Sequence, residues 1–317
     1  MSTFVSVIIP TKNGAEFLDE VLTAVLSQKT DFGYEVIVID SGSKDNSLEI
    51  IQKHNVRLIQ IHPTEFNHGG TRNFGVQNSQ GEFIAFITQD ATPANDQWLQ
   101  NLVLPLREQP EIAGVFGKHL PREDCDPIVA LNLYRHFDGF SLQRKCWQQD
   151  QKYEENQGQY IFFSNNNSCI RRSIWEKIPF RCVEMSEDQW WAKDIIENGY
   201  IKCYEPTATV YHSHTYSATE WMKRQFDEYR AYQQIGVVEK ASIFNYMKRF
   251  VGLFYGDLRQ LVKTSQLSFT QKIYWIWQRF FNNLGIITGQ FYGTYSDNIP
   301  SYISRKILSE QSRKQEN

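Results

Sequence analysis

The amino-acid sequence predicts an α/β protein in which a doubly wound, mostly parallel sheet is followed by a helical C-terminal region. Three observations lead to this fold class. Over the first hundred residues, short apolar runs typical of buried strands alternate with segments whose apolar residues follow a helical period. Polar residues directly follow the ends of several of these strands. Beyond residue 219 the sequence changes to long segments rich in aromatic and basic residues.

The first four expected strands are separated by helices. We expect strands over residues 4–9, 34–39, 56–61 and 83–88, and helices over residues 15–28, 47–54 and 71–79. This alternation implies parallel pairing with right-handed crossovers, and such sheets bind ligands at the carboxyl ends of their strands. Here those ends carry Thr11, Asn13, Asp40, Ser41, Gln89 and Asp90.

Later elements are expected around a second polar region. Residues 161–163 read as a strand, and a loop of small residues follows at 164–172. Ser186 can cap a helix that ends at Gly199.

Composition narrows the class of protein. The chain has 317 residues, 41% of them hydrophobic, and no apolar run of about 18 residues that would span a membrane. No signal peptide is evident, and five cysteines without a Cys-x-x-Cys pair favour reduced thiols in a cytoplasmic protein, without a disulfide framework or zinc site.

Charge is unevenly distributed along the chain. Residues 220–317 contain 14 Lys and Arg against 8 Asp and Glu, a balance of +6, so the total of −3 leaves −9 for residues 1–219. A basic, aromatic, helical region can contact an anionic membrane face, or it can pack on the main domain or form a homodimer. No dense basic cluster indicates nucleic-acid binding.

Two neighbouring motifs indicate a site for a metal-bound diphosphate. Residues 65–73 read Glu-Phe-Asn-His-Gly-Gly-Thr-Arg-Asn, and residues 88–90, at the end of a strand, read Thr-Gln-Asp. Glycines allow close backbone approach, an arginine suits phosphate, and a carboxylate suits a hard metal ion.

These motifs, with Val-Ile-Ile-Pro-Thr-Lys-Asn at residues 7–13 and Val-Ile-Val-Ile-Asp-Ser-Gly-Ser at 36–43, resemble inverting family 2 glycosyltransferases of the GT-A fold, a Rossmann-like sheet. The histidine-glycine segment and Thr-Gln-Asp are similar to bacterial rhamnosyltransferases that build surface polysaccharides. The resemblance covers residues 4–216. It implies a glycosyltransferase domain over 1–219, with nucleotide-sugar binding in 1–100 and acceptor binding and catalysis in 101–219, before the helical region 220–317.

The resemblance also implies site residues. Asp40 would accept a hydrogen bond from the pyrimidine N3–H, and Arg72 would face the donor's phosphates or base. The full expected nucleotide-sugar set is Pro10, Thr11, Asn13, Asp40, Ser41, Ser43, His68, Gly69, Gly70, Arg72, Asn73, Gln89 and Asp90.

The metal motif departs from the family pattern. Many members have Asp-x-Asp where this chain has Thr88-Gln89-Asp90, so Gln89 could replace the first carboxylate only as a neutral partner. Asp90 remains as the carboxylate for Mg²⁺ or Mn²⁺. His212 and His214, two residues apart on an extended segment, could both face the ion, and His214 is the preferred ligand of the two.

Catalytic and acceptor residues are expected in the second half of the domain. Glu187 and Asp188 match the acidic pair that carries the base, with Asp188 preferred and a helix-dipole role as the structural alternative. The expected acceptor residues are Asn165, Asn166, Trp190 and Trp191.

The resemblance, taken with these residues, implies a metal-dependent inverting transferase that moves L-rhamnose from dTDP-β-L-rhamnose to a lipid-linked polysaccharide acceptor at the inner membrane face. Another UDP- or dTDP-hexose is the alternative donor. A non-catalytic nucleotide- or glycan-binding subunit of a synthase complex is the alternative role. A nucleotidyltransferase would carry a glycine-rich basic loop after the first strand, which Pro10–Gly14 matches poorly.

Overall fold

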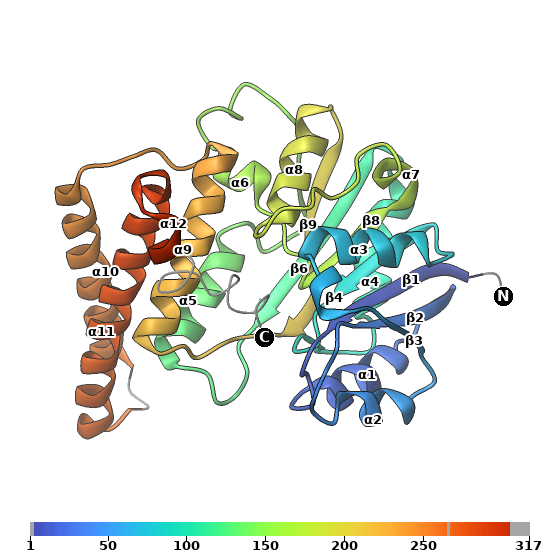
Figure 1. The fold of residues 1–317 in the computed structure, drawn as a ribbon, viewed down its shortest axis with the longest axis horizontal. Coiled ribbons are helices and arrows are strands. Elements are labelled where there is room, and N and C mark those ends of the chain that lie inside the picture. Colours follow the sequence, from blue (N-terminus) through green and yellow to red (C-terminus); the bar gives the residue numbers. More distant parts are fainter. Residues whose placement is uncertain (1–2, 265–266, 305–317) are drawn as a thin grey trace. The chain divides into compact units, whose positions relative to one another are not determined.

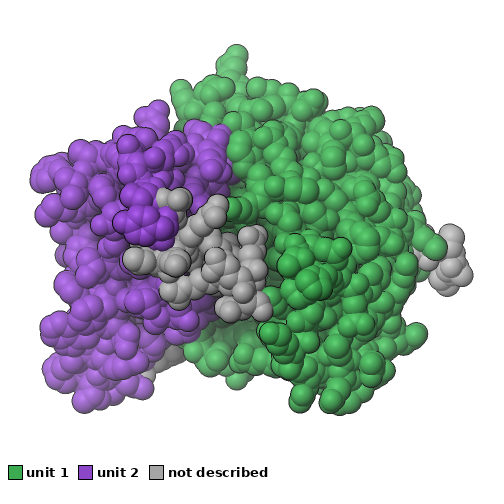
Figure 2. Space-filling view, in the orientation of Figure 1, with its two compact units in different colours: residues 1–125, 130–213 green, residues 126–129, 214–317 purple. Residues whose placement is uncertain are grey.

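The computed structural model describes residues 3–264 and 267–304, and it divides into two compact units (Figure 2). The first unit runs as far as Cys125 and then from Ala130 to Ser213, and the second takes Asp126–Val129 and continues from His214. We describe each unit by itself.

A mixed sheet is the centre of the first unit (Figure 1). Its strands are β1 (Thr3–Thr11), β2 (Gly33–Asp40), β3 (Arg57–Gln60), β4 (Phe83–Ile87), β5 (Thr92–Pro93), β6 (Ile112–Leu120), β7 (Lys145–Trp147), β8 (Asn167–Arg171) and β9 (Ile201–Tyr211). The order is β3-β2-β1-β4-β8-β6-β9-β5, and β7 pairs with β9. Strands β3, β2, β1 and β4 are parallel, β8 is antiparallel to both of its neighbours, and β6 and β9 are parallel again.

Helices connect these strands as the alternating pattern predicted. They are α1 (Leu18–Leu26), α2 (Ser47–Gln52), η1 (Pro63–Glu65), α3 (His68–Gln77), α4 (Trp98–Glu108), α5 (Pro127–Asp138), α6 (Gln157–Ile161), α7 (Arg172–Trp175) and α8 (Glu187–Glu197). Val7 and Ile9 of β1 are fully buried in a core with Leu22 of α1 and Leu102 of α4. The expected doubly wound, mostly parallel sheet is therefore confirmed.

Three local expectations are wrong. The helix expected over residues 71–79 begins at His68, with both glycines in its first turn, because the Asn67 side chain accepts from the Gly70 N–H and starts the helix there. Residues 161–163 form no strand, and the strand of that region is β8. Ser186 precedes α8 but has a left-handed backbone (φ 61°), and its side chain makes no capping bond.

The expectation of reduced thiols throughout is also wrong. Cys146 of β7 and Cys203 of β9 lie directly opposite each other in an antiparallel pair and form a disulfide. The two residues are 57 positions apart, and nothing in their local sequence marks them as partners, because the β7–β9 pairing that brings them together is long-range.

The second unit is helical, as expected. It contains α9 (Ala218–Ile235), α10 (Ile243–Lys263), α11 (Phe269–Thr294), η2 (Ser296–Asn298) and α12 (Ser301–Ile303). Gly285, Gly289 and Gly293 let α11 approach the backbone of α9 so closely that a Cβ at Gly285 would lie 2.1 Å from a carbonyl oxygen. Among the described residues, no helix combines the length and hydropathy needed to cross a membrane.

Candidate active site

The loops after β1 and β2 are tied together by the polar residues that the sequence singled out. Thr11 and Asp40 are register partners, and the Ser41 N–H and hydroxyl both donate to the Thr11 carbonyl. The Asn13 N–H donates to the Ser43 hydroxyl oxygen at 2.8 Å. The protein's own hydrogen bonds therefore hold the ends of β1 and β2 together.

Asp40 is buried at the centre of this arrangement. Its Oδ1 accepts from the N–H groups of Gly42 and Ser43, and its Oδ2 accepts from the Ser43 hydroxyl. Gly42 supplies the positive φ of 84° that the turn requires. Asp40 thus organises its own turn. Pro10, half-buried at the end of β1, pairs with Ile39 of the same strand as Asp40.

Gln89 has a clear role that its neutral side chain suits. Its Oε1 accepts from the Lys12 N–H at 2.8 Å, and its Nε2 donates to the Lys12 carbonyl at 3.1 Å. An amide can both accept and donate in this way, whereas an ionised carboxylate here could make only the first bond. Gln89 therefore fixes the loop after β1 to the loop that carries Asp90.

Asp90 and His212, two of the expected metal ligands, lie close together in the first unit, with His212 Nε2 3.6 Å from Asp90 Oδ1. His214 belongs to the second unit, and its role as a ligand stays a prediction. Carboxylate oxygen and imidazole nitrogen suit Mn²⁺ and other divalent ions. The donor set therefore fits a divalent cation.

Arg122 is a residue of this region that sequence reasoning missed. Its Nη2 donates to the Asp90 carbonyl and the Thr92 hydroxyl, and its guanidinium lies 4.0 Å from the centre of the Phe17 ring. The backbone N–H of Arg122 donates to the Ser213 hydroxyl oxygen, next to His212. Arg122 therefore supports both chain segments that carry Asp90 and His212. No sequence signal identified it, because it lies in a polar stretch without a motif.

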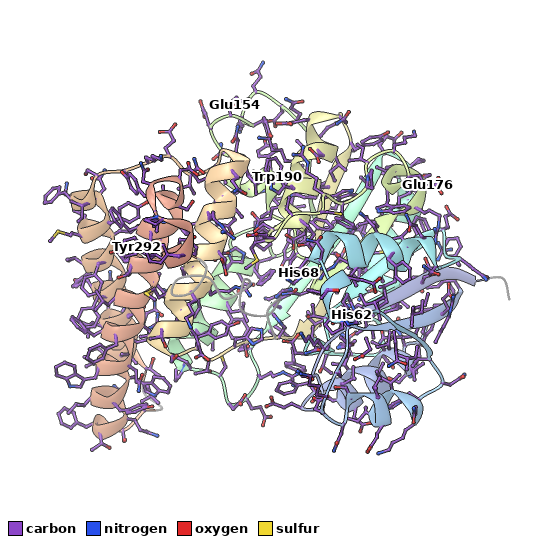
Figure 3. All side chains as sticks on the ribbon, viewed as in Figure 1. His62, His68, Glu154, Glu176, Trp190 and Tyr292 are labelled. Atoms are coloured by element: carbon purple, nitrogen blue, oxygen red, sulfur yellow. A yellow bond between two sulfur atoms is a disulfide. The ribbon has the colours of Figure 1, made fainter. Side chains whose placement is uncertain are left out.

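The histidine-glycine segment, expected to bind the donor, holds the chain segment that leads into α8. The Asn67 side chain donates to the Val183 carbonyl, and the Asn73 side chain binds both the N–H and carbonyl of Phe180. Gly69 packs against the carbonyl of Arg181, and a Cβ at position 69 would lie 2.1 Å from that oxygen. His68 begins the helix, half-buried (Figure 3). We call these contacts the α3 clamp.

The α3 clamp ends in a buried ion pair. Arg72 Nη1 lies 2.9 Å from Glu187 Oε1, and each side chain is at most 6% exposed. Burial by itself would raise the pKa of Glu187, but Arg72, His68 and the Asn165 amide together lower it below its ordinary value. Glu187 is therefore held as a carboxylate. Arg72 is committed to it and exposes little surface to a phosphate.

Asp188 has the opposite electrostatic environment. Burial and the adjacent Glu187 carboxylate raise the pKa of Asp188 to about 7, against smaller lowering by the Asn165 N–H and by Arg72. The Asn165 N–H donates to its Oδ2 and the Gln189 N–H to its Oδ1. A carboxylate oriented in this way and titrating near neutrality has the properties of a general base.

The four expected acceptor residues separate into different environments. Asn165 is buried and binds both acidic residues, with its amide donating to Glu187 at 3.1 Å. Asn166 is half-buried beside it. Trp190 is half-buried on α8 with the Arg181 guanidinium 4.1 Å from its ring centre (Figure 3). Trp191 is fully buried in the core, where it exposes no surface to an acceptor.

Comparison with known proteins assigns the family. A model described as Glycosyl transferase family 2 matches residues 6–178, more than half of the chain. The chain belongs to glycosyltransferase family 2. It is 34% identical over 229 residues to the O-antigen chain rhamnosyltransferase RfbN of Salmonella typhimurium (strain LT2), with 70% of each protein covered. It is 30% identical over 227 residues to the O-antigen chain rhamnosyltransferase WbaN of Salmonella anatum, again over 70% of each.

Solved structures confirm the GT-A fold. The mannosyltransferase PcManGT from Pyrobaculum calidifontis, in complex with GDP-Man and Mn²⁺, matches this family 2 chain with a TM-score of 0.60 at 16% identity. The match covers 92% of this chain and 87% of that one. The S. aureus TarS fragment 1–349 matches with a TM-score of 0.51. The protein is therefore a glycosyltransferase of the expected fold.

Proposed function

We propose that this glycosyltransferase moves L-rhamnose from dTDP-β-L-rhamnose to a hydroxyl of a lipid-linked O-antigen glycan, with inversion and with the help of a divalent cation. The choice of sugar and acceptor rests on the likeness to two O-antigen rhamnosyltransferases over 70% of the chain. The proposed chemistry rests on the acidic pair at the start of α8, in which Arg72 holds Glu187 in an ion pair and the pKa of Asp188 is raised to about 7.

Asp188 is the proposed base. Its carboxylate takes the proton of the acceptor hydroxyl while that oxygen attacks the anomeric carbon. The bond to the leaving phosphate oxygen breaks on the opposite face, and its electron pair departs with the nucleoside diphosphate. A β-linked donor then gives an α-linked product. General-base assistance of this kind is typically worth about 10² to 10⁴ in rate.

Glu187 and Asn165 position the base. Glu187 holds the Asn165 amide while the Asn165 N–H holds Asp188, so the two acidic side chains share one partner without competing for one bond. The charge of Glu187 also keeps the pKa of Asp188 high enough for effective proton transfer.

The remaining polar groups are proposed to bind the donor. Thr11, Asn13, Asp40 and Ser43 lie together at the carboxyl ends of β1 and β2, where such sheets bind nucleotides. Asp90 and His212 would hold a Mg²⁺ or Mn²⁺ ion, with His214 as the further ligand expected from the sequence. When bound, the ion would offset the negative charge that develops on the leaving diphosphate. Because the proposed acceptor is lipid-linked, we place the reaction at the cytoplasmic face of the inner membrane.

Calorimetric titration with dTDP, UDP and GDP, each with and without Mn²⁺, tests the donor site. We expect Mn²⁺-dependent binding of dTDP that is lost in Asp90→Ala. It should persist in Asp31→Ala, which removes a surface carboxylate paired with Arg107. Binding of UDP without dTDP would reassign the donor. Absence of binding to any pyrimidine diphosphate would overturn the enzymatic proposal in favour of a non-catalytic subunit.

Hydrolysis of dTDP-L-rhamnose and transfer to membrane extracts test the base. We expect Asp188→Asn to bind dTDP normally and to lose at least about 100-fold in turnover. Full activity in this variant would remove Asp188 from the mechanism, and loss of nucleotide binding would show that it serves the donor site instead.

A further inference from the structure

The second unit exposes far more apolar surface than its packing explains. On α10, Phe244, Met247, Val251, Tyr255 and Val262 are exposed at spacings of three, four, four and seven residues, which places them on one helix face. On α11 the exposed stripe is Phe269, Ile273, Trp277, Phe281 and Leu284. Val262 is 71% exposed and Trp277 is 61% exposed. We call these ten residues the α10–α11 stripe.

Other residues already supply the internal contacts of these helices. Phe250 and Phe254 of α10 each contact Phe280 of α11 at 5.5 Å between ring centres. The Tyr246 hydroxyl donates to Thr294 at the far end of the pair. The α10–α11 stripe is therefore additional to the helix–helix interface. An apolar stripe left exposed on both helices marks a contact with a partner outside this helix pair.

The charges on these helices identify the partner. Of residues 243–263 and 269–294, all of which the structure describes, only Asp257 is acidic, and it is buried against Arg279 and Asn283. Lys248, Arg259 and Lys263 are exposed, and 3.6 residues per turn place them along one edge of the stripe on α10. The exposed surface thus combines aromatic residues with positive charge and has no exposed carboxylate on either helix.

We propose that the α10–α11 stripe docks on an anionic lipid bilayer, with its aromatic and aliphatic side chains among the headgroups and the basic edge against lipid phosphates. Tyrosine and tryptophan suit that interface because one end of the ring is apolar and the other is polar. A symmetric pairing of two copies through this face would bring their basic edges together without exposed acidic partners on these helices. The charge pattern therefore favours a bilayer over a second copy.

The α10–α11 stripe would be the contact surface for the membrane location included in the proposed function. The inference itself depends only on exposed residues of the second unit. Its test needs neither donor nor acceptor, so it can fail while the catalytic proposal stands. In the same way, a protein that binds no nucleotide could still bind vesicles.

The test is sedimentation of the full-length protein with vesicles of phosphatidylcholine alone or mixed with phosphatidylglycerol. We expect binding to the anionic vesicles at least tenfold stronger than to neutral ones, and weakened by salt. The triple variant Met247→Gln/Val251→Gln/Trp277→Gln should lose at least tenfold, and so should Lys248→Glu/Lys263→Glu. Leu142→Gln is the matched control, because Leu142 is 80% exposed on the first unit.

Equal binding of the wild type to both vesicle types, or unchanged binding in the triple variant, would overturn the proposal. Sedimentation velocity without lipid tests the alternative that a second copy of the chain binds the stripe. A wild-type dimer that dissociates in the triple variant would assign the stripe to a second copy of the chain. Far-ultraviolet circular dichroism and thermal unfolding check that the variants keep their helices. We expect the helices to be kept, because substitutions at exposed positions usually change stability little.

Discussion

Replacing Glu187 with glutamine should move the acid limb of the pH–rate profile to lower pH. Burial and the Glu187 carboxylate are the two causes that raise the pKa of Asp188 to about 7. The substitution keeps the shape of the side chain and removes the second cause while burial remains. It also leaves the positive charge of Arg72 nearby, which lowers the pKa of Asp188 further.

The expected size follows from the fraction of Asp188 that is ionised. With a pKa of about 7, about half is ionised at pH 7 and about a tenth at pH 6. A downward shift of about one unit would bring the ionised fraction at pH 6 to about a half. Activity at pH 6, expressed relative to each protein's own plateau, should therefore rise about fivefold in the variant.

The assay is kcat/KM for donor hydrolysis or transfer across the pH range, which reports the pKa of the free enzyme. Removing Glu187 alone leaves Arg72 buried and unpaired, so the single variant should also unfold more readily. The double variant Arg72→Met/Glu187→Gln removes both charges and serves as the control. Its acid limb should also move down, but by less. An acid limb that stays in place or moves upward in Glu187→Gln would refute this account of the pair.

Three further predictions concern stability. Because folding raises the pKa of Asp188, the stabilising contribution of this group is complete below the unfolded pKa of about 4 and is lost as the pH rises through about 7. Urea titrations should therefore show that Asp188→Asn is more stable, relative to the wild type, at pH 8 than at pH 5. Gly69→Ala should destabilise by about 1–3 kcal/mol, since its methyl group would lie 2.1 Å from a carbonyl oxygen, whereas Gly70→Ala, with 3.5 Å of room, should melt near the wild-type temperature. Cys146→Ser should cost about 2–4 kcal/mol under oxidising conditions and nothing in reductant, with Cys125→Ser as the neutral control.

The part of the fold that local pattern determines was predictable from sequence. The four parallel strands and their helices have strong periodicity, and each lies within a few residues of its expected place. The antiparallel strand β8 was misplaced because Phe162 and Phe163 are apolar enough to suggest a strand, while Asn167 and Ser168 are not. Those two polar residues are buried in the strand because their side chains find partners, Asn167 bonding Trp98 and Ala208. Such long-range partners leave no mark on the local sequence.

The site was predictable as a set of residues but not as a set of contacts. The sequence indicated Arg72 as part of the donor site and Glu187 as part of the acidic pair that carries the base. The structure joins the two residues in one buried ion pair. Nothing in either motif marks the other as its partner, because the two residues are 115 positions apart in the sequence and the contact depends on how α3 packs. The roles of the remaining site residues stay predictions.

The α3 clamp constrains how this enzyme could be redesigned. Residues 67–73 and 180–188 are far apart in sequence, yet specific hydrogen bonds and an ion pair join them, and only glycine at position 69 leaves room for the Arg181 carbonyl. A chimera that imports the histidine-glycine segment from a relative, with the aim of changing the donor sugar, would also exchange the support of the base. Recombination between such enzymes should therefore succeed when the two segments travel together, and crossovers between them should yield proteins that bind nucleotide but turn over poorly.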